Sequence, residues 1–336
     1  MKASVVIPVY NKAPYLRECL DSVLAQSFKD YELIAVDDAS TDGSSEVLRS
    51  IDDPRLRVIA LDRNVGPGGA AQRGMDAAIG EYILRVDADD IMLPGRFAKQ
   101  IAFMDERPEI GASSGHLQLL SDPTTLHHVE LEDADCKARM LFGVPLNQPA
   151  TIYRRSVLVE HDIRFKDEWP RYGEDWMQQI EIARFTRFHN LDEPLIRYRQ
   201  GTNNIAHGRD RPEDLRVLYR YVFAHLGFTI SPEELELQLM TVRCIPVPVD
   251  ATRVKAFQRW LENIASQNAR SMTFESGALQ RQLDRIWKEF FYQLPAFGWA
   301  PSITHLRSSE SPTWKQLYYL LAFMLRRGAS EKEKKG

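Results

Sequence analysis

The first 200 residues alternate between short apolar runs and amphipathic helical patterns, and this alternation restricts the fold more than any other feature. Residues 4–9 form an apolar, β-branched run of the kind buried on both faces of a parallel sheet. Apolar residues then recur at i, i+3, i+4, i+7 and i+8, which predicts an amphipathic helix over residues 16–24. The two patterns repeat, with strands predicted at 33–36, 56–61, 82–86, 110–119 and 150–153. A short helix is predicted to run through residues 47 and 48, and further helices are predicted at 69–79 and after Pro94. Such repetition predicts an α/β fold with a mostly parallel sheet flanked by helices.

Beyond about residue 205 the strand patterns stop and helical patterns take over. Helices are predicted at 215–226, 232–242, 254–264, 279–290 and 315–325. The polar segment 199–212, rich in Gln, Gly, Asn and charged residues, is the natural boundary. We therefore expect an α/β domain at 1–205 and an α-helical C-terminal region at 206–336.

Composition and charge exclude several classes of protein. Hydrophobic residues make up 44% of the chain and charged residues 27%, which excludes a disordered or collagen-like chain. Residues 251–336 hold 14 Lys and Arg against 7 Asp and Glu, so this segment carries +7 and the first 250 residues carry −11 of the net −4. An acidic body argues against a nucleic-acid partner, whereas the basic tail suits an anionic membrane surface.

The cysteines and the N-terminus bear on the compartment. Cys19, Cys136 and Cys244 are scattered without metal-ligand spacing, which is typical of a reduced cytosolic protein. The first residues show no signal-peptide pattern, and no stretch approaches the roughly 20 apolar residues that span a bilayer. The expected location is cytoplasmic, either free or peripheral on the inner face of the cell membrane.

Acidic residues directly follow two of the predicted strands. Asp37 and Asp38 follow strand 33–36, and the tetrapeptide Asp87-Ala88-Asp89-Asp90 follows strand 82–86. Open α/β sheets bind ligands at the carboxyl ends of their strands. Carboxylates at i and i+2 can hold Mg²⁺ or Mn²⁺, which would bridge the oxygens of a diphosphate. Ordinary loop chemistry is the alternative for either acidic cluster taken alone.

Five short motifs occur along the chain in an order and spacing that resemble a known family. They are Pro8-Val9-Tyr10-Asn11-Lys12, Val36-Asp37-Asp38-Ala39-Ser40-Thr41-Asp42-Gly43, Gly80-Glu81-Tyr82-Ile83, Asp87-Ala88-Asp89-Asp90 and Gly173-Glu174-Asp175-Trp176. Together they resemble the family 2 glycosyltransferases, over about residues 2–200. The resemblance implies a GT-A fold, a nucleotide-sugar donor, a divalent metal and an inverting mechanism.

Carried over position by position, the resemblance implies a role for each matched residue. Donor binding falls to Pro8, Val9, Tyr10, Asn11, Asp38, Arg73, Asp87 and Asp89. Within this set, Asp38 would accept the imide N–H of a uracil or thymine ring. Asp87 and Asp89 form the DXD element, and Asp89 and Asp90 would hold Mg²⁺ or Mn²⁺. Asp175 would be the general base, with Glu174 as an orienting or acceptor-binding acid.

The remaining candidates each keep a structural alternative. Family members often carry Ala-Arg-Asn where this chain has Ala71-Gln72-Arg73, so Arg73 is displaced by one residue, or about 100° around a helix. Four residues are candidates for the acceptor side, with the protein core as the alternative for Trp176: Gln148, Trp169, Tyr172 and Trp176. His207 is either a late metal ligand or a solvated loop histidine.

The function expected from this sequence is metal-dependent, inverting transfer of a sugar from a UDP-sugar to a hydroxyl of a glycan or lipid-linked saccharide. Polysaccharide or lipopolysaccharide synthesis is one setting for that reaction. The alternative is an inactive glycosyltransferase-like protein that binds a nucleotide or a glycan. Residues 314–325 form an apolar helix followed by basic residues, which predicts a peripheral membrane contact. The alternatives are docking on this protein's own core or on a second subunit in a homodimer.

Two other enzyme classes fit less well. The segment Gly66-Pro67-Gly68-Gly69-Ala70-Ala71 fits the dinucleotide fingerprint G-x-G-x-x-A, with Asp87 about 20 residues onward. Residues 62–65, however, separate these glycines from the preceding strand, so the tight strand–turn–helix geometry is missing. A sugar-nucleotide pyrophosphorylase would need a Gly-rich basic loop after the first strand, where this chain has Asn11-Lys12-Ala13-Pro14.

Overall fold

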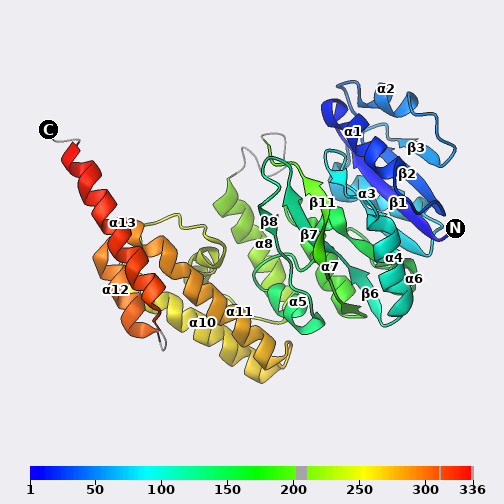
Figure 1. Ribbon diagram of the computed structural model, residues 1–336. Coiled ribbons are helices and arrows are strands. Elements are labelled where there is room, and N and C mark those ends of the chain that lie inside the picture. The colour runs from blue at the N-terminus through cyan, green and yellow to red at the C-terminus, as the bar shows by residue number, and fades with distance from the viewer. Residues whose placement is uncertain (202–209, 310–311, 334–336) are drawn as a thin grey trace. The chain divides into compact units, whose positions relative to one another are not determined.

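The computed structural model describes residues 1–201, 210–309 and 312–333. The chain divides into two compact units, Met1–Gly208 and Arg209–Gly336. Figure 1 shows unit 1 in blue to green, with strands and helices mixed, and unit 2 in yellow-green to red. The described part of unit 2 contains only helices and turns.

Unit 1 is built on a seven-stranded sheet with the order β10-β6-β9-β4-β1-β2-β3. The central strand β1 pairs in parallel with β2 and with β4, and β2 pairs in parallel with β3. One strand of this sheet, β9, lies between β4 and β6 and runs antiparallel to both. The strands are β1 (Ala3–Val9), β2 (Tyr31–Asp37), β3 (Leu56–Ala60), β4 (Tyr82–Arg85), β6 (Ile110–Ser113), β9 (Ile152–Arg154) and β10 (Arg187–Phe188).

A smaller sheet has the order β5-β11-β7-β8. Its strands are β5 (Ile91–Met92), β7 (Gly115–Leu119), β8 (Leu126–His127) and β11 (Leu191–Tyr198). The strand predicted at 110–119 is therefore two strands, β6 and β7, in different sheets. The break is at Ser114, whose N–H donates to Asn190 Oδ1 over 2.7 Å instead of joining a sheet.

The helices of unit 1 bury an apolar side against the large sheet. In the first, Leu16, Cys19, Leu20 and Val23 are buried, which is the face that the sequence spacing predicts. Every residue of β2 is buried, as expected for a strand covered on both faces. The helices are α1 (Ala13–Leu24), α2 (Ser44–Arg49), α3 (Gly66–Ala77), α4 (Arg96–Glu106), α5 (Asp133–Arg139), α6 (Arg155–Glu160) and α7 (Glu174–Ala183), with a 3-10 turn η1 (Gln148–Ala150).

Unit 2 is a helical assembly with an aromatic core. Phe223 stacks on Trp260 with ring centroids 5.7 Å apart, and Phe257 lies 4.5 Å from Phe290. Its elements are α8 (Arg211–Leu226), α9 (Pro232–Gln238), η2 (Leu239–Val242), α10 (Ala251–Ser271), α11 (Ser276–Phe290), η3 (Phe291–Phe297), α12 (Trp299–Ser308) and α13 (Trp314–Glu333). Among the described helices, none combines the length and the apolar character that crossing a membrane requires.

Candidate active site

The loops that follow β1, β2 and β4 lie at one edge of the large sheet, because these strands are parallel neighbours. Val9 is in register with Asp37, and the Asp38 N–H donates to the Val9 carbonyl oxygen over 2.8 Å. On the other side of β1, the Val86 N–H donates to the Val6 carbonyl oxygen over 3.2 Å. This edge is therefore where the sequence predicts ligand binding.

The loop after β1 is braced against the loop after β2. Asn11 adopts a left-handed conformation with φ 51°, and its Oδ1 accepts a hydrogen bond of 2.8 Å from the Thr41 N–H. Of the donor residues predicted here, Pro8 and Val9 belong to β1, and Val9 is fully buried. Tyr10 is 47% exposed, so its ring is the part of this loop most open to a ligand.

Two neighbouring aspartates at the end of β2 have different partners. Asp37 accepts hydrogen bonds from the Ser40 N–H and the Ser45 hydroxyl, so it holds its own loop. Asp38 accepts from the N–H groups of Val65 (2.7 Å) and Gly66 (3.0 Å) at the start of α3. Burial raises the pKa of Asp38, and these two amides oppose the rise. An ionised carboxylate has about four acceptor positions, so Asp38 retains capacity for a nucleobase N–H.

The acidic tetrapeptide after β4 contains three carboxylates in different surroundings. Asp89 forms an ion pair with Lys12, whose Nζ lies 2.5 Å from Asp89 Oδ2. Asp87 is half-buried, with 40% of its side chain exposed, and lies 3.7 Å from the Arg85 guanidinium. Asp90 is buried; its Oδ1 accepts from the Arg199 N–H over 2.9 Å, and its Oδ2 has no hydrogen-bond partner among the described residues.

Two of these carboxylates, Asp87 and Asp90, have a raised pKa. Loss of hydration raises the pKa of Asp90 to about 8, and the charge of Asp87 adds to the rise. Loss of hydration likewise raises the pKa of Asp87 to about 6; Arg85 opposes this, whereas Asp89 and Asp175 reinforce it. A cation bound among these carboxylates would return them to the ionised form.

The predicted base and its neighbour occupy the first turn of α7, which begins after Gly173 in a left-handed conformation (φ 85°). Asp175 Oδ1 accepts a hydrogen bond of 2.9 Å from the Trp176 N–H. Burial raises the pKa of Asp175, and Arg85 opposes the rise. Burial also raises the pKa of Glu174 to about 7, while the Gly68 N–H favours its ionised form. The charge of Asp175 in turn adds to the raised pKa of Asp87 in the acidic tetrapeptide.

Sequence reasoning missed two buried arginines beneath this site. Arg85 on β4 is buried, with its Nε and Nη1 lacking hydrogen-bond partners among the described residues, and it faces Asp87. Arg96 on α4 is fully buried and donates to the carbonyl oxygens of Arg85 (2.8 Å) and Pro149 (2.9 Å). Arg96 therefore anchors the end of the strand that leads into the acidic tetrapeptide.

The predicted acceptor residues are placed unevenly. Trp169 and Trp176 are buried, and Trp176 Nε1 donates to the Met140 carbonyl oxygen over 2.9 Å, which favours the core alternative for Trp176. Gln148 Oε1 accepts from the Tyr153 hydroxyl over 2.8 Å, so this side chain belongs to an internal network. Tyr172 is half-buried, directly before the turn into α7.

Arg73 is exposed on α3. It lies five residues beyond Gly68, or about 140° around the helix from the side of α3 that faces Glu174. The position therefore gives no support to the predicted diphosphate contact of Arg73. The residue at position 72, where family members often have the arginine, is a glutamine, and its Oε1 accepts a hydrogen bond of 2.9 Å from the Phe165 N–H.

The acidic residues suit a divalent cation that is bound jointly by the protein and a substrate. They are less suited to a metal that the protein alone would hold. Asp87, Asp89 and Asp90 offer hard oxygen ligands, and the unpartnered Asp90 Oδ2 is an oxygen without a role in the fold. Nowhere in the described ranges do three His, Cys, Asp or Glu side chains form a metal-binding group. Mg²⁺ commonly binds through one or two carboxylates and substrate phosphates, which this arrangement allows. His207 lies outside the described residues.

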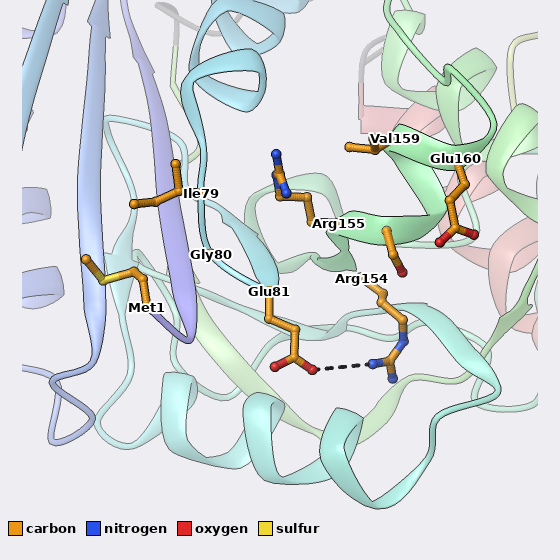
Figure 2. Close-up of a pocket in the computed structure, with 9 residues that line it drawn as sticks. Met1, Ile79, Gly80, Glu81, Arg154, Arg155, Val159 and Glu160 are labelled. Carbon is orange, nitrogen blue, oxygen red and sulfur yellow. Dashed lines mark ion pairs between the residues drawn. The ribbon is translucent and has the colours of Figure 1, made fainter.

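A surface pocket lies at the opposite edge of the sheet. Figure 2 shows Met1, Ile79, Gly80 and Glu81 at the amino ends of β1 and β4, with Arg154 at the end of antiparallel β9. Glu81 and Arg154 approach to 3.9 Å across it. The pocket holds about 470 Å³ but lacks the acidic tetrapeptide and Asp175, so we assign the chemistry to the carboxyl edge.

Comparison with known sequences agrees with this geometry. Residues 4–157 match the family described as Glycosyl transferase family 2. The chain is 33% identical over 184 residues to the succinoglycan biosynthesis protein ExoO of Rhizobium meliloti, covering 51% of this chain and 53% of that protein. It is 45% identical over 174 residues to a poly(ribitol-phosphate) beta-glucosyltransferase of Bacillus spizizenii, covering 49% of this chain. The chain spans only 27% of that second relative.

Solved structures agree with the fold. S. aureus TarS, residues 1–349 in complex with UDP-GlcNAc, superposes with a TM-score of 0.57 at 22% identity, covering 88% of this chain and 84% of that one. The mannosyltransferase PcManGT of Pyrobaculum calidifontis, in complex with GDP-Man and Mn²⁺, gives a TM-score of 0.52 at 19% identity, covering 97% and 86%. The fold of this chain is thus the GT-A type that the sequence predicts. The unit that carries the acidic edge therefore matches glycosyltransferase family 2 over residues 4–157.

Proposed function

We propose that this protein is an inverting glycosyltransferase that moves a sugar from a nucleotide-diphosphate sugar to a hydroxyl of a glycan or lipid-linked saccharide. The observation that carries the proposal is that Asp38, Asp89 and the start of α7, which bears Asp175, gather at one edge of the sheet. Relatives named for succinoglycan biosynthesis and for glucosyl transfer to poly(ribitol-phosphate) support a role in polysaccharide synthesis. Such a role would place the enzyme in the cytoplasm.

UDP is the nucleotide that the site favours. A carboxylate at Asp38 can accept the imide N–H of uracil, and its two amide partners hold it at the end of β2. Thymine offers the same group, so dTDP is the closest competitor. The structure of TarS with UDP-GlcNAc supports a uridine donor in this fold.

In the proposed reaction the Asp175 carboxylate accepts the proton of the acceptor hydroxyl as its oxygen attacks the anomeric carbon. The bond from that carbon to the diphosphate oxygen breaks in the same step, and the leaving group keeps its electron pair. A single displacement inverts the anomeric configuration and needs no covalent nucleophile. Lys12, beside Asp89, is placed to offset charge on the departing diphosphate.

Asp89 and Asp90 would hold the divalent metal, Mg²⁺ or Mn²⁺. When bound, such an ion supplies Lewis-acid stabilisation of a leaving diphosphate. The unpartnered oxygen of Asp90 and the Mn²⁺ in the structurally similar mannosyltransferase support this assignment. The runner-up function, binding of nucleotide or glycan without turnover, would keep the same site and lack transfer.

Calorimetric titration of UDP with and without Mn²⁺ tests the donor site. Wild type is expected to bind UDP at least about tenfold more tightly with Mn²⁺, and Asp89→Ala is expected to lose that difference. Removing Asp89 also leaves Lys12 without its ion-pair partner, so metal-free affinity should stay equal or rise. The exposed Asp52→Ala serves as the matched control. If UDP, GDP and dTDP all fail to bind wild type, the nucleotide-sugar proposal is wrong.

We also propose that α13 is a peripheral membrane contact. Trp314, Tyr318 and Leu325 on one side of this helix are 85%, 76% and 75% exposed. Its other side contacts η3, where Tyr319 and Tyr292 meet with ring centroids 5.0 Å apart. Residues 312–336 contain six Lys and Arg and two Glu, which favours an anionic lipid surface over a second, equally basic copy. A stable dimer also needs roughly 20–30 residues a side, far more than this stripe offers.

Co-sedimentation with vesicles tests this contact. Wild type is expected to bind phosphatidylglycerol vesicles at least about fivefold better than phosphatidylcholine vesicles, since basic residues near a membrane contribute roughly 1 kcal/mol each. The triple variant Trp314→Ser, Tyr318→Ser, Leu325→Ser should lose this binding. Met272→Ser is the control: it removes a similarly exposed apolar side chain at the C-cap of α10, and it should still bind the vesicles. The contrary outcome has two parts: wild type fails to bind vesicles, and light scattering shows a wild-type dimer that the triple variant does not form. That outcome would assign α13 to a homodimer contact.

A further inference from the structure

The start of α3 receives its hydrogen-bond acceptors from two distant acids. The first N–H groups of a helix have no partner within the helix, and here no side chain at the N-cap residue Val65 supplies one. Asp38, from the end of β2, accepts from Val65 and Gly66. Glu174, from the start of α7, accepts from Gly68 over 2.5 Å. The proposed nucleobase acid and the neighbour of the proposed base therefore hold the same helix end.

Glycine at position 68 is what allows the second contact. A Cβ atom built on Gly68 would lie 2.4 Å from Glu174 Oε2 and 2.5 Å from Glu174 Cδ, closer than real atoms approach. Any side chain at 68 would push Glu174 away from the helix. The glycine-rich segment that resembles a dinucleotide fingerprint thus has a different explanation, which is close approach of a carboxylate from α7.

We propose that Gly68 and Glu174 form a link that positions Asp175, with Glu174 as a positioning residue and no share in the proton transfer. The inference rests on the proposed function, because it assigns Asp175 the role of base. Its basis is that the Glu174 carboxylate accepts a hydrogen bond from Gly68 on α3, and that Asp175 is the next residue in the same turn of α7. We call this contact the α3–α7 link.

The link connects donor binding to the base through one rigid element. Asp38, the proposed nucleobase contact, also accepts hydrogen bonds from Val65 and Gly66 at the start of α3. The same turn of α3 donates to Glu174 through the Gly68 N–H. Displacing a reacting group by 1 Å can cost roughly 10²-fold in rate. Loss of the link should therefore reduce kcat while leaving nucleotide affinity unchanged.

Two variants of Glu174 separate positioning from proton transfer. Glu174→Ala is expected to lower kcat by about 10–100-fold with the dissociation constant for UDP within about threefold of wild type. Glu174→Gln keeps an oxygen that can accept from the Gly68 N–H, so it should retain at least about a third of the wild-type kcat. If Glu174→Gln is as impaired as Glu174→Ala, or if Glu174→Ala is fully active, the proposal is overturned.

A thermal-unfolding cycle tests the link without any activity. Gly68→Ala should lower Tm in the wild-type background, because the new methyl group collides with Glu174. In the Glu174→Ala background the same change should leave Tm equal or raise it, because alanine favours a helix more than glycine does. If Gly68→Ala lowers Tm in both backgrounds, or raises it in both, no link exists. If wild type binds no nucleotide and transfers no sugar, the proposed function fails, whereas this cycle still decides whether the link forms.

Discussion

Asp175→Asn is expected to lower kcat by about 10²–10⁴-fold while leaving UDP binding intact, because an amide cannot accept the proton of the acceptor hydroxyl. Asparagine has the same shape and keeps the Oδ1 that accepts from the Trp176 N–H. The start of α7 should therefore keep its structure, so that a loss of activity reports on chemistry. The assay is release of UDP from a UDP-sugar with an acceptor saccharide, followed over time.

The pH dependence of the transfer rate provides a second test of Asp175 as the base. Burial raises the pKa of Asp175 in the folded protein, and the base works only when ionised. Activity should therefore fall as the pH drops through that raised pKa, above the ordinary aspartate value of about 3.9. Asp52→Asn, an exposed change, should match wild type in rate and pH profile. Retention of more than a tenth of wild-type kcat in Asp175→Asn would remove Asp175 from the role of base.

Most of the fold of unit 1 could be predicted because its signal is local. The apolar run at 4–9 became β1, and the helical spacing at 16–24 became most of α1. The break at Ser114 could not be predicted, since its cause is Asn190, which lies 76 residues away in the sequence. A continuous apolar run carries no sign that its two halves join different sheets.

Much of the acidic edge was also within reach of the sequence, because parallel strands place the residues that follow them side by side. The supporting cations were missed for a physical reason: Arg85 and Arg96 lie at buried positions of a strand and a helix, where apolar residues are expected. Arg85 interrupts the buried run of β4, and Arg96 is on the same side of α4 as Gln100 and Met104. A charge at a buried position is itself the signal, since such a group needs partners.

The role of the glycines at 66–69 was not predictable for another reason. Their pattern alone fits a nucleotide-binding turn, and the deciding contact comes from Glu174, 106 residues later than Gly68. A run of glycines indicates that another group packs closely against that backbone, but the sequence does not identify the group.

Arg96→Met is expected to destabilise unit 1 by about 3–5 kcal/mol, because it removes a buried cation whose hydrogen bonds satisfy buried oxygens. Arg96 donates to the carbonyl oxygens of Arg85 and Pro149 and to Gln100 Oε1 over 2.8–2.9 Å. Methionine has a similar length but no donor, so these oxygens would stay buried without partners. The change also frees the end of β4, directly before the acidic tetrapeptide.

Urea unfolding followed by far-ultraviolet circular dichroism measures this effect through the midpoint and slope of the transition. Lys99→Met is the matched control, because it removes a cation from the same helix whose partner, Glu193, is at the surface. An exposed ion pair of this kind contributes at most about 1 kcal/mol. A loss below about 1 kcal/mol in Arg96→Met would mean that the carbonyl oxygens find other donors. The end of β4 would then be held by the sheet alone, and Arg96 would not be needed to place the acids that follow it.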